Sequence, residues 1–125
     1  MQEIAEPFSK LYGFDACIGW LYQKEEGYFT GVSLRQTVGN KASLFKGYVE
    51  EHGLSLNGSI GIGDSKGDID LLETVKQPIA FNPSAELLEK ALEKGWDIVV
   101  ERKNIGYELK KRKNGTFVLE KTDLL

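Results

Sequence analysis

The chain has 125 residues, of which 41% are hydrophobic and 28% charged, so it can bury one modest core and not two. A formal net charge of -3 argues against a large nucleic-acid interface, and no apolar stretch approaches the roughly 20 residues that a membrane span needs. Cys17 is the only cysteine, which excludes an intrachain disulfide and fits a reducing, cytoplasmic setting. We therefore expect a soluble protein with neither nucleic acid nor membrane as a partner.

The predicted elements follow an order that is typical of an α/β fold. Residues 3–12 carry apolar side chains at helical spacing, and Pro7 predicts either a helix start near Glu6 or a kink. The other elements are, in chain order, strands at 15–22 and 28–32 that form a hairpin, a helix at 40–52, a strand at 59–63, a helix at 68–75, a strand at 78–81, a helix from 82 to 94 and a strand at 97–100. Short, continuously apolar strands separated by helices indicate a parallel sheet that is covered on both faces.

The last 25 residues predict a terminal β-hairpin. Apolar and polar residues alternate over 105–109, Asn114-Gly115 is a strong tight-turn signal, and a second apolar stretch follows at 116–119. The basic run at 110–113 has two interpretations. It contacts an anionic surface, or it belongs to a solvated strand edge where lysines discourage unwanted pairing, and we favour the second.

The segment from residue 60 to residue 72 carries the chemically informative side chains. An apolar strand places Asp64 at its C-terminal end, which is the edge of an open α/β sheet where ligands bind. Asp68 lies four residues later, in the first turn of the next helix, so the two carboxylates can face one point. Two hard oxygen donors suit Mg²⁺, which binds a few carboxylates together with water and phosphate oxygens. The same residues also allow an interpretation without a metal ion. Gly-Asp turns are common between strands and helices, and the carboxylate of Asp68 can simply interact favourably with the dipole of its helix.

Three glycines in the same segment predict a close approach between backbone and ligand. Gly61, Gly63 and Gly67 have no β-carbon, so a bound group can lie near the main chain. The N-terminus of the helix that follows adds partial positive charge, which favours phosphate.

Residues 63–68, with Leu71 and Leu72 after them, resemble the fourth signature motif of the haloacid dehalogenase superfamily, and most of all the subgroup that contains phosphoserine phosphatase. Residues 39–42, at the start of a helix, resemble the third motif, whose lysine is catalytic and corresponds to Lys41. Further similarity lies in Gly13-Phe14-Asp15-Ala16, Thr30-Gly31, Asn82-Pro83 and Lys94-Gly95-Trp96.

The resemblance implies a fold and a division of the chain. It covers about residues 3–100 in the family's order and predicts a Rossmann-like core, the C-terminal part of a three-layer parallel sheet. Residues 1–100 would form a partial hydrolase core with only the third and fourth motifs. Residues 101–125 would be a C-terminal extension that forms the β-hairpin.

The resemblance also implies a role for each site residue. Asp64 would bind Mg²⁺ directly, and Asp68 would support the metal directly or through water. Lys41 would neutralise charge on the nucleophile and the phosphoryl group, whereas without the resemblance it is an exposed helix lysine. Ser65 and Gly67 would lie next to the phosphate. Related phosphatases often have asparagine where this chain has Gly67, which leaves the substrate class open, with phosphoserine-like small phosphomonoesters as the leading candidates.

The family's first and second motifs have no counterpart in this sequence. The first is an apolar strand ending in Asp-x-Asp-x-Thr/Val, which supplies the nucleophile and the general acid. Only residues 68–70 have that spacing, and no apolar strand precedes them. In the family fold the nucleophile strand lies beside the strand at 59–63, which would here keep an unpaired edge. We therefore expect an upstream segment or a partner chain to supply both motifs, and the chain alone to be inactive.

Three functions remain open on the sequence alone. The first is a fragment of a Mg²⁺-dependent phosphomonoester hydrolase that acts through an aspartyl-phosphate. The second is a non-catalytic remnant or regulatory half-domain of the same fold, and the third is a generic doubly wound binding module. Under all three, we interpret Asp70 as a solvated helix residue and His52 as structural and not catalytic.

Overall fold

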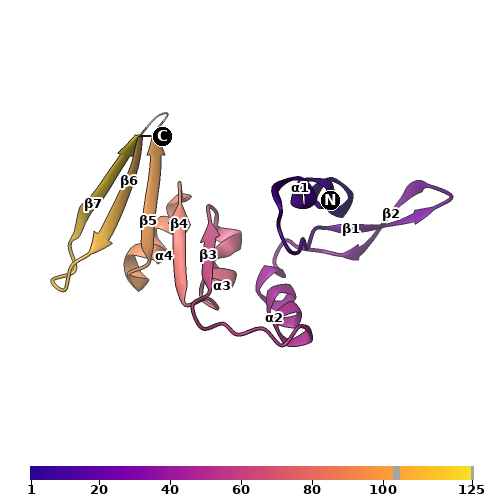
Figure 1. The fold of residues 1–125 in the computed structure, drawn as a ribbon, viewed down its shortest axis with the longest axis horizontal. Coiled ribbons are helices and arrows are strands. Elements are labelled where there is room, and N and C mark those ends of the chain that lie inside the picture. The colour runs from indigo at the N-terminus through magenta and orange to yellow at the C-terminus, as the bar shows by residue number, and fades with distance from the viewer. Residues whose placement is uncertain (103–104, 125) are drawn as a thin grey trace.

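A computed structural model describes residues 1–102 and 105–124, and Figure 1 shows α1 and a β-hairpin at one end of the molecule, a sheet at the other and α2 between them. The elements are α1 (Gln2–Tyr12), β1 (Leu21–Glu25), β2 (Tyr28–Arg35), α2 (Lys41–Glu51), β3 (Ile60–Gly63), the 3₁₀ turn η1 (Lys66–Asp68), α3 (Ile69–Leu72), β4 (Gln77–Phe81), α4 (Ala85–Lys94), β5 (Asp97–Arg102), β6 (Ile105–Lys111) and β7 (Phe117–Leu124). No helix within these described ranges is long and apolar enough to cross a bilayer.

The predicted α/β fold is confirmed, with a mixed sheet in the order β3-β4-β5-β6-β7. Strands β3, β4 and β5 are parallel, as the alternation of strands and helices predicts. Strands β6 and β7 then continue the sheet in antiparallel fashion, so the predicted terminal hairpin is part of the same sheet. The predicted boundary between residues 100 and 101 falls inside β5.

The core lies between the sheet and helices α3 and α4. Ala80 of β4 is paired with Ile98 of β5, so both side chains point to the same face of the sheet, and both are fully buried. Leu72 of α3 and Leu87 and Ala91 of α4 complete the fully buried cluster on that face. The two helices that were expected to flank the sheet therefore cover a single face of it.

The glycines of β3 bring α3 close to the strand. A β-carbon at Gly61 would lie 2.9 Å from the side chain of Val75, and one at Gly63 would lie 2.5 Å from Cβ of Asp68. The space expected for a ligand at these two glycines is thus filled by side chains of the chain itself. Because side chains alternate along a strand, Ile60 and Ile62 point to the opposite face, where they are 60% and 63% exposed.

Helix α3 is shorter than the predicted helix at 68–75. It begins with the 3₁₀ turn η1, and the α-helical part ends at Leu72. The hydroxyl group of Thr74 donates a hydrogen bond of 2.7 Å to the carbonyl oxygen of Leu71, which also accepts one of 3.0 Å from the amide of Thr74. Local bonding of a threonine side chain thus competes with continuation of the helix.

The N-terminal unit is held together by the side chain of Gln2. Its Oε1 accepts hydrogen bonds from the amide of Gly19 at 2.6 Å and from Arg35 at 2.7 Å, and its Nε2 donates to the carbonyl of Cys17. Residues 17–20 are therefore bound to α1 in place of a strand partner, and β1 begins at Leu21 and not at residue 15 as predicted. The hairpin of β1 and β2 is present, with antiparallel pairing.

Helix α1 exposes its apolar stripe. The helix begins at Gln2 with Pro7 inside it, so the predicted start near Glu6 is wrong. Ile4, Phe8 and Leu11, which share one face at helical spacing, are all exposed. The apolar face that the sequence predicts is therefore real, but within residues 1–102 and 105–124 more than half of each of these side chains stays exposed.

The terminal hairpin packs against the core. Leu109 and Phe117 contact the buried cluster, and Nζ of Lys111 donates a hydrogen bond of 3.0 Å to the carbonyl of Leu92 near the end of α4. At the predicted turn, Gly115 has a positive φ of 85° and Asn114 accepts hydrogen bonds from Thr116. The hairpin therefore contributes to the stability of the sheet.

Leu87→Ala is expected to lower the free energy of unfolding by about 2–5 kcal/mol, because the residue is fully buried and the truncation leaves a cavity. The matched control is Leu92→Ala on the same helix, where the side chain is 37% exposed and the loss should stay below about 1 kcal/mol. Fluorescence of Trp96, which packs against the core, measures the urea midpoint at one fixed protein concentration. Equal losses for the two variants would contradict the described core.

Candidate functional site

Asp64 stands at the C-terminal edge of the parallel strands. It follows the last residue of β3 directly and is exposed. Within the described residues, no hydrogen bond or ion pair engages its carboxylate. Its backbone is fixed, because its carbonyl oxygen accepts a hydrogen bond of 2.7 Å from the amide of Ser84. The chain therefore presents a free carboxylate on a held backbone.

The carboxylate of Asp68 is buried and fully engaged. Its Oδ1 accepts a hydrogen bond of 2.5 Å from Nζ of Lys41. Its Oδ2 accepts from the hydroxyl of Ser65 at 2.7 Å, from the amide of Ser65 at 3.1 Å and from the amide of Asp64 at 3.3 Å. Asp68 thus fixes the turn that carries Asp64, and it binds the lysine of the third-motif segment.

The ion pair between Lys41 and Asp68 connects two distant parts of the chain. Lys41 is the first residue of α2, and its partner lies 27 positions later. The side chain of Asp68 is 8% exposed and that of Lys41 is 40% exposed, so the carboxylate is shielded from solvent while the lysine side chain reaches it. A cation near a buried carboxylate and open to solvent is available to a phosphoryl group.

The surroundings of Asp68 set its charge. Burial disfavours the carboxylate and is the strongest single influence on its pKa, but hydrogen bonds from Lys41 and Ser65 and the charge of Lys41 act in the other direction. Together these contacts lower the pKa of Asp68 below its ordinary value. The group is therefore ionised in the folded protein at neutral pH.

The site offers few protein ligands for a metal ion. The described ranges 1–102 and 105–124 contain no group of three or more His, Cys, Asp or Glu side chains that could hold one. Asp64 has free oxygens, whereas both oxygens of Asp68 already accept hydrogen bonds. Because Mg²⁺ keeps several waters and accepts phosphate oxygens, one or two carboxylates suffice on the protein side, and Asp64 fits as one of them.

Ser65 and Gly67, predicted to lie next to phosphate, occupy the same turn. The hydroxyl of Ser65 donates to Asp68, so it serves the turn itself. Gly67 is exposed, and apart from its two chain neighbours a β-carbon there would meet, among the described residues, the Oγ of Ser65 at 3.7 Å and nothing else within 4 Å. Both residues are thus in the predicted loop, one engaged and one open.

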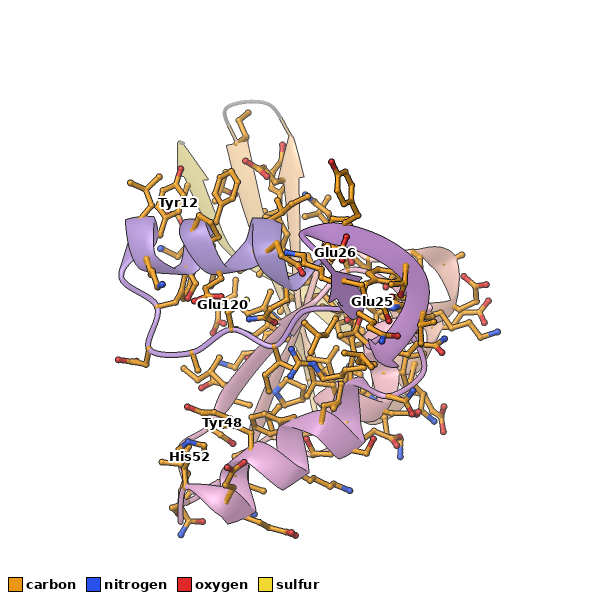
Figure 2. All side chains as sticks on the ribbon, turned by 90° about the vertical axis from the view of Figure 1, so that its right-hand side faces the viewer. Tyr12, Glu25, Glu26, Tyr48, His52 and Glu120 are labelled. Atoms are coloured by element: carbon orange, nitrogen blue, oxygen red, sulfur yellow. The ribbon has the colours of Figure 1, made fainter. Side chains whose placement is uncertain are left out.

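His52 lies away from this cluster, and Asp70 makes no hydrogen bond to it within the described residues. Figure 2 shows Tyr48 and His52 together at the C-terminal end of α2, and their rings stack with centroids 4.0 Å apart. Lys41 begins the same helix, which puts the lysine and the histidine about 16 Å apart along its axis. Asp70 is exposed, as predicted.

An apolar cavity beside Lys41 was not predicted. Its volume is about 290 Å³. It is lined by Ile18, Thr37, Lys41, Leu44, Phe45 and Leu71. These residues come from four separate segments, so no local pattern in the sequence predicts the cavity.

A family model described as haloacid dehalogenase-like hydrolase matches residues 1–73, which is more than half of the chain. The histidinol-phosphatase of Neisseria meningitidis serogroup C is 34% identical over 103 residues, covering 77% of this chain and 46% of that protein. The phosphoserine phosphatase SerB1 of Mycobacterium tuberculosis is 29% identical over 98 residues, covering 77% and 32%.

A solved structure is also similar. The crystal structure of a protein with unknown function from Bordetella pertussis Tohama I matches with a TM-score of 0.67 and 29% identity, over 77% of this chain and 45% of that one. The chain thus spans about a third to a half of the length of these relatives. On the extent of the family match, the chain belongs to the haloacid dehalogenase-like hydrolases.

Proposed function

We propose that the chain forms the C-terminal part of the active site of a Mg²⁺-dependent phosphatase that acts on small-molecule phosphomonoesters. The observation that carries this proposal is the free carboxylate of Asp64 beside the Lys41–Asp68 ion pair, at the C-terminal edge of a parallel sheet. Relatives named histidinol-phosphatase and phosphoserine phosphatase support a small phosphate ester as substrate.

Lys41 is the catalytic residue that this chain supplies. Its ammonium group would contact the phosphoryl oxygens and offset the negative charge that develops as the phosphorus–oxygen bond breaks. Asp68 holds that ammonium in place, and its second oxygen holds the turn that carries Asp64. We assign Asp68 to positioning, because both of its oxygens already accept hydrogen bonds from the chain.

Asp64 would hold Mg²⁺, which when bound neutralises phosphate charge and orients the ester for in-line attack. Ser65 and Gly67 then lie in the loop next to the phosphate, and the backbone of Gly67 is open there. The other metal ligands would come from water, the phosphate and a carboxylate outside this chain.

The nucleophile would be an aspartate outside residues 1–125. Its carboxylate oxygen attacks phosphorus, and the bond from phosphorus to the ester oxygen breaks, so that the alcohol leaves with a proton from a general acid. Water then attacks the aspartyl-phosphate, which releases inorganic phosphate and restores the carboxylate. We therefore expect the chain alone to be inactive.

An upstream segment or a partner chain would complete the sheet. Strand β3 is at one end of the strand order, with no partner on its outer side within the described residues, and its Ile60 and Ile62 are more than half exposed. The upstream segment or partner chain would also cover two further apolar surfaces, which are the exposed stripe of α1 and the cavity beside Lys41. The longer relatives have room for such a segment.

A non-catalytic half-domain of the same fold is the second candidate. The full engagement of both oxygens of Asp68, and the lack of a three-residue metal cluster in the described ranges, favour it. This candidate predicts no Mg²⁺ affinity beyond that of scattered surface carboxylates.

Asp64→Asn is expected to lower Mg²⁺ affinity at least about tenfold, because it removes the free carboxylate of the site. Isothermal titration calorimetry of the full chain measures the affinity. Asp70→Asn is the matched control, since Asp70 is exposed in the same segment and its loss should leave affinity within about twofold. Equal affinities for both variants would favour the non-catalytic candidate.

Asp68 should make the free energy of unfolding fall as the pH is lowered into the acidic range. Its pKa is lowered by folding, so its contribution is present above the ordinary aspartate value of about 3.9 and is lost as the pH falls through the lower folded value. Asp68→Asn should be about 2 kcal/mol less stable near neutral pH, and the gap should narrow below about pH 4. Urea midpoints across that range measure it, with Asp70→Asn expected to follow the parent profile. A gap that stays constant with pH would refute the assigned ion pair.

The outer side of β3 should drive self-association of the isolated chain. Sedimentation velocity is expected to show concentration-dependent oligomers, and Ile62→Lys should shift them toward monomer, because a charge on an exposed strand opposes pairing. Leu119→Lys is the control, since Leu119 is 53% exposed on β7 at the other end of the sheet. A parent chain that stays monomeric and unfolds reversibly at all concentrations would contradict the missing partner.

A further inference from the structure

The loop between β4 and α4 has an unusual backbone at Asn82. Its φ is 43°, in the left-handed region that asparagine tolerates better than most residues with a side chain. Pro83 follows, and a proline disfavours the right-handed helical conformation of the residue before it. The backbone conformation of the loop is therefore restricted at two successive residues, whereas a simple connection between a strand and a helix requires no such restriction.

Asn82 is bound to β5 through both main chain and side chain. Its amide donates a hydrogen bond of 2.8 Å to the carbonyl of Val99. Its side-chain Oδ1 accepts a hydrogen bond of 2.7 Å from the amide of Glu101. These two contacts fix the direction in which the chain leaves β4.

The same loop also forms a hydrogen bond with the backbone of Asp64. Two residues after Asn82, the amide of Ser84 donates a hydrogen bond of 2.7 Å to the carbonyl oxygen of Asp64. Ser84 also begins α4, because its hydroxyl accepts from the amide of Leu87. A continuous series of contacts thus runs from β5, through Asn82 and Ser84, to the residue that follows β3.

We propose that Asn82 is a positioning residue for Asp64. By holding the loop against β5, it places the Ser84 amide on the Asp64 carbonyl, which fixes the backbone that carries the Asp64 carboxylate. The inference rests on the proposed metal site and adds to it a residue that touches neither metal nor substrate. Partners that orient a metal ligand in this way affect affinity about as strongly as some ligands do.

The test is Mn²⁺ affinity of the full chain, measured by electron paramagnetic resonance titration. Asn82→Ala should weaken binding about tenfold, because it removes the acceptor for Glu101 and disfavours the left-handed backbone. Asn82→Asp should restore affinity to within about threefold, since it keeps the oxygen and tolerates that backbone. Asn114→Ala, which removes a similar turn contact in the distal hairpin, should leave affinity unchanged.

A second pair of variants tests the contact with Asp64 itself. The φ of Ser84 is -59°, which proline adopts, so Ser84→Pro removes the amide donor while keeping the backbone direction. Ser84→Ala keeps that donor and removes only the hydroxyl that caps α4. Ser84→Pro should weaken Mn²⁺ binding about tenfold more than Ser84→Ala. This comparison holds even if Asn82→Ala fails to fold.

The outcomes separate the inference from the proposed function. If Asp64→Asn abolishes Mn²⁺ binding while Asn82→Ala and Ser84→Pro bind like the parent, the metal site stands and the positioning role is overturned. If Asp64→Asn binds like the parent, the proposed metal site itself is overturned. Weakened binding in Asn82→Ala and Ser84→Pro, with rescue in Asn82→Asp, supports the role.

Discussion

The ion pair between Lys41 and Asp68 is the contact on which the arrangement of the site depends. A carboxylate that is 8% exposed requires donors on both oxygens, and removing one partner of such a pair leaves a buried charge uncompensated. Here one oxygen is held by α2 and the other by the turn after β3. The same carboxylate therefore docks the N-terminal half of the chain, shapes the turn and places the one cation that the proposed chemistry requires of this chain.

Local sequence patterns predicted the parts of the fold that local physics determines. The strand that ends before Asp64 and the turn at Asn114-Gly115 are both found where apolar runs and turn residues put them. Patterns failed where the outcome depends on distant partners. The glycines of β3 suggested space for a ligand, but Asp68 and Val75, which flank α3, fill it, because residue spacing does not show how a helix packs on a strand.

The sequence named the residues of the candidate site but not the contacts between them. Lys41, Asp64 and Asp68 were identified by resemblance, yet their spacing could not show that the lysine would occupy one oxygen of Asp68. The hydrogen bonds that connect Asn82 to β5 and Ser84 to Asp64 were also not predicted. Their one local signal is an asparagine before a proline after a strand, and the partners lie in β5 and just after β3, far away in sequence.

The proposed upstream segment or partner chain would account for the open surfaces and for the single free carboxylate of the site. A strand added beside β3 would cover its free edge, bring backbone partners to residues 60–63 and place a further carboxylate at the sheet edge near Asp64. The most direct measurement of this account is paramagnetic broadening of amide resonances of the full chain by Mn²⁺. The account predicts that broadening centres on the amides of Asp64, Ser65 and Ser84. Broadening spread evenly over the exposed carboxylates of α4 and the terminal hairpin would contradict it.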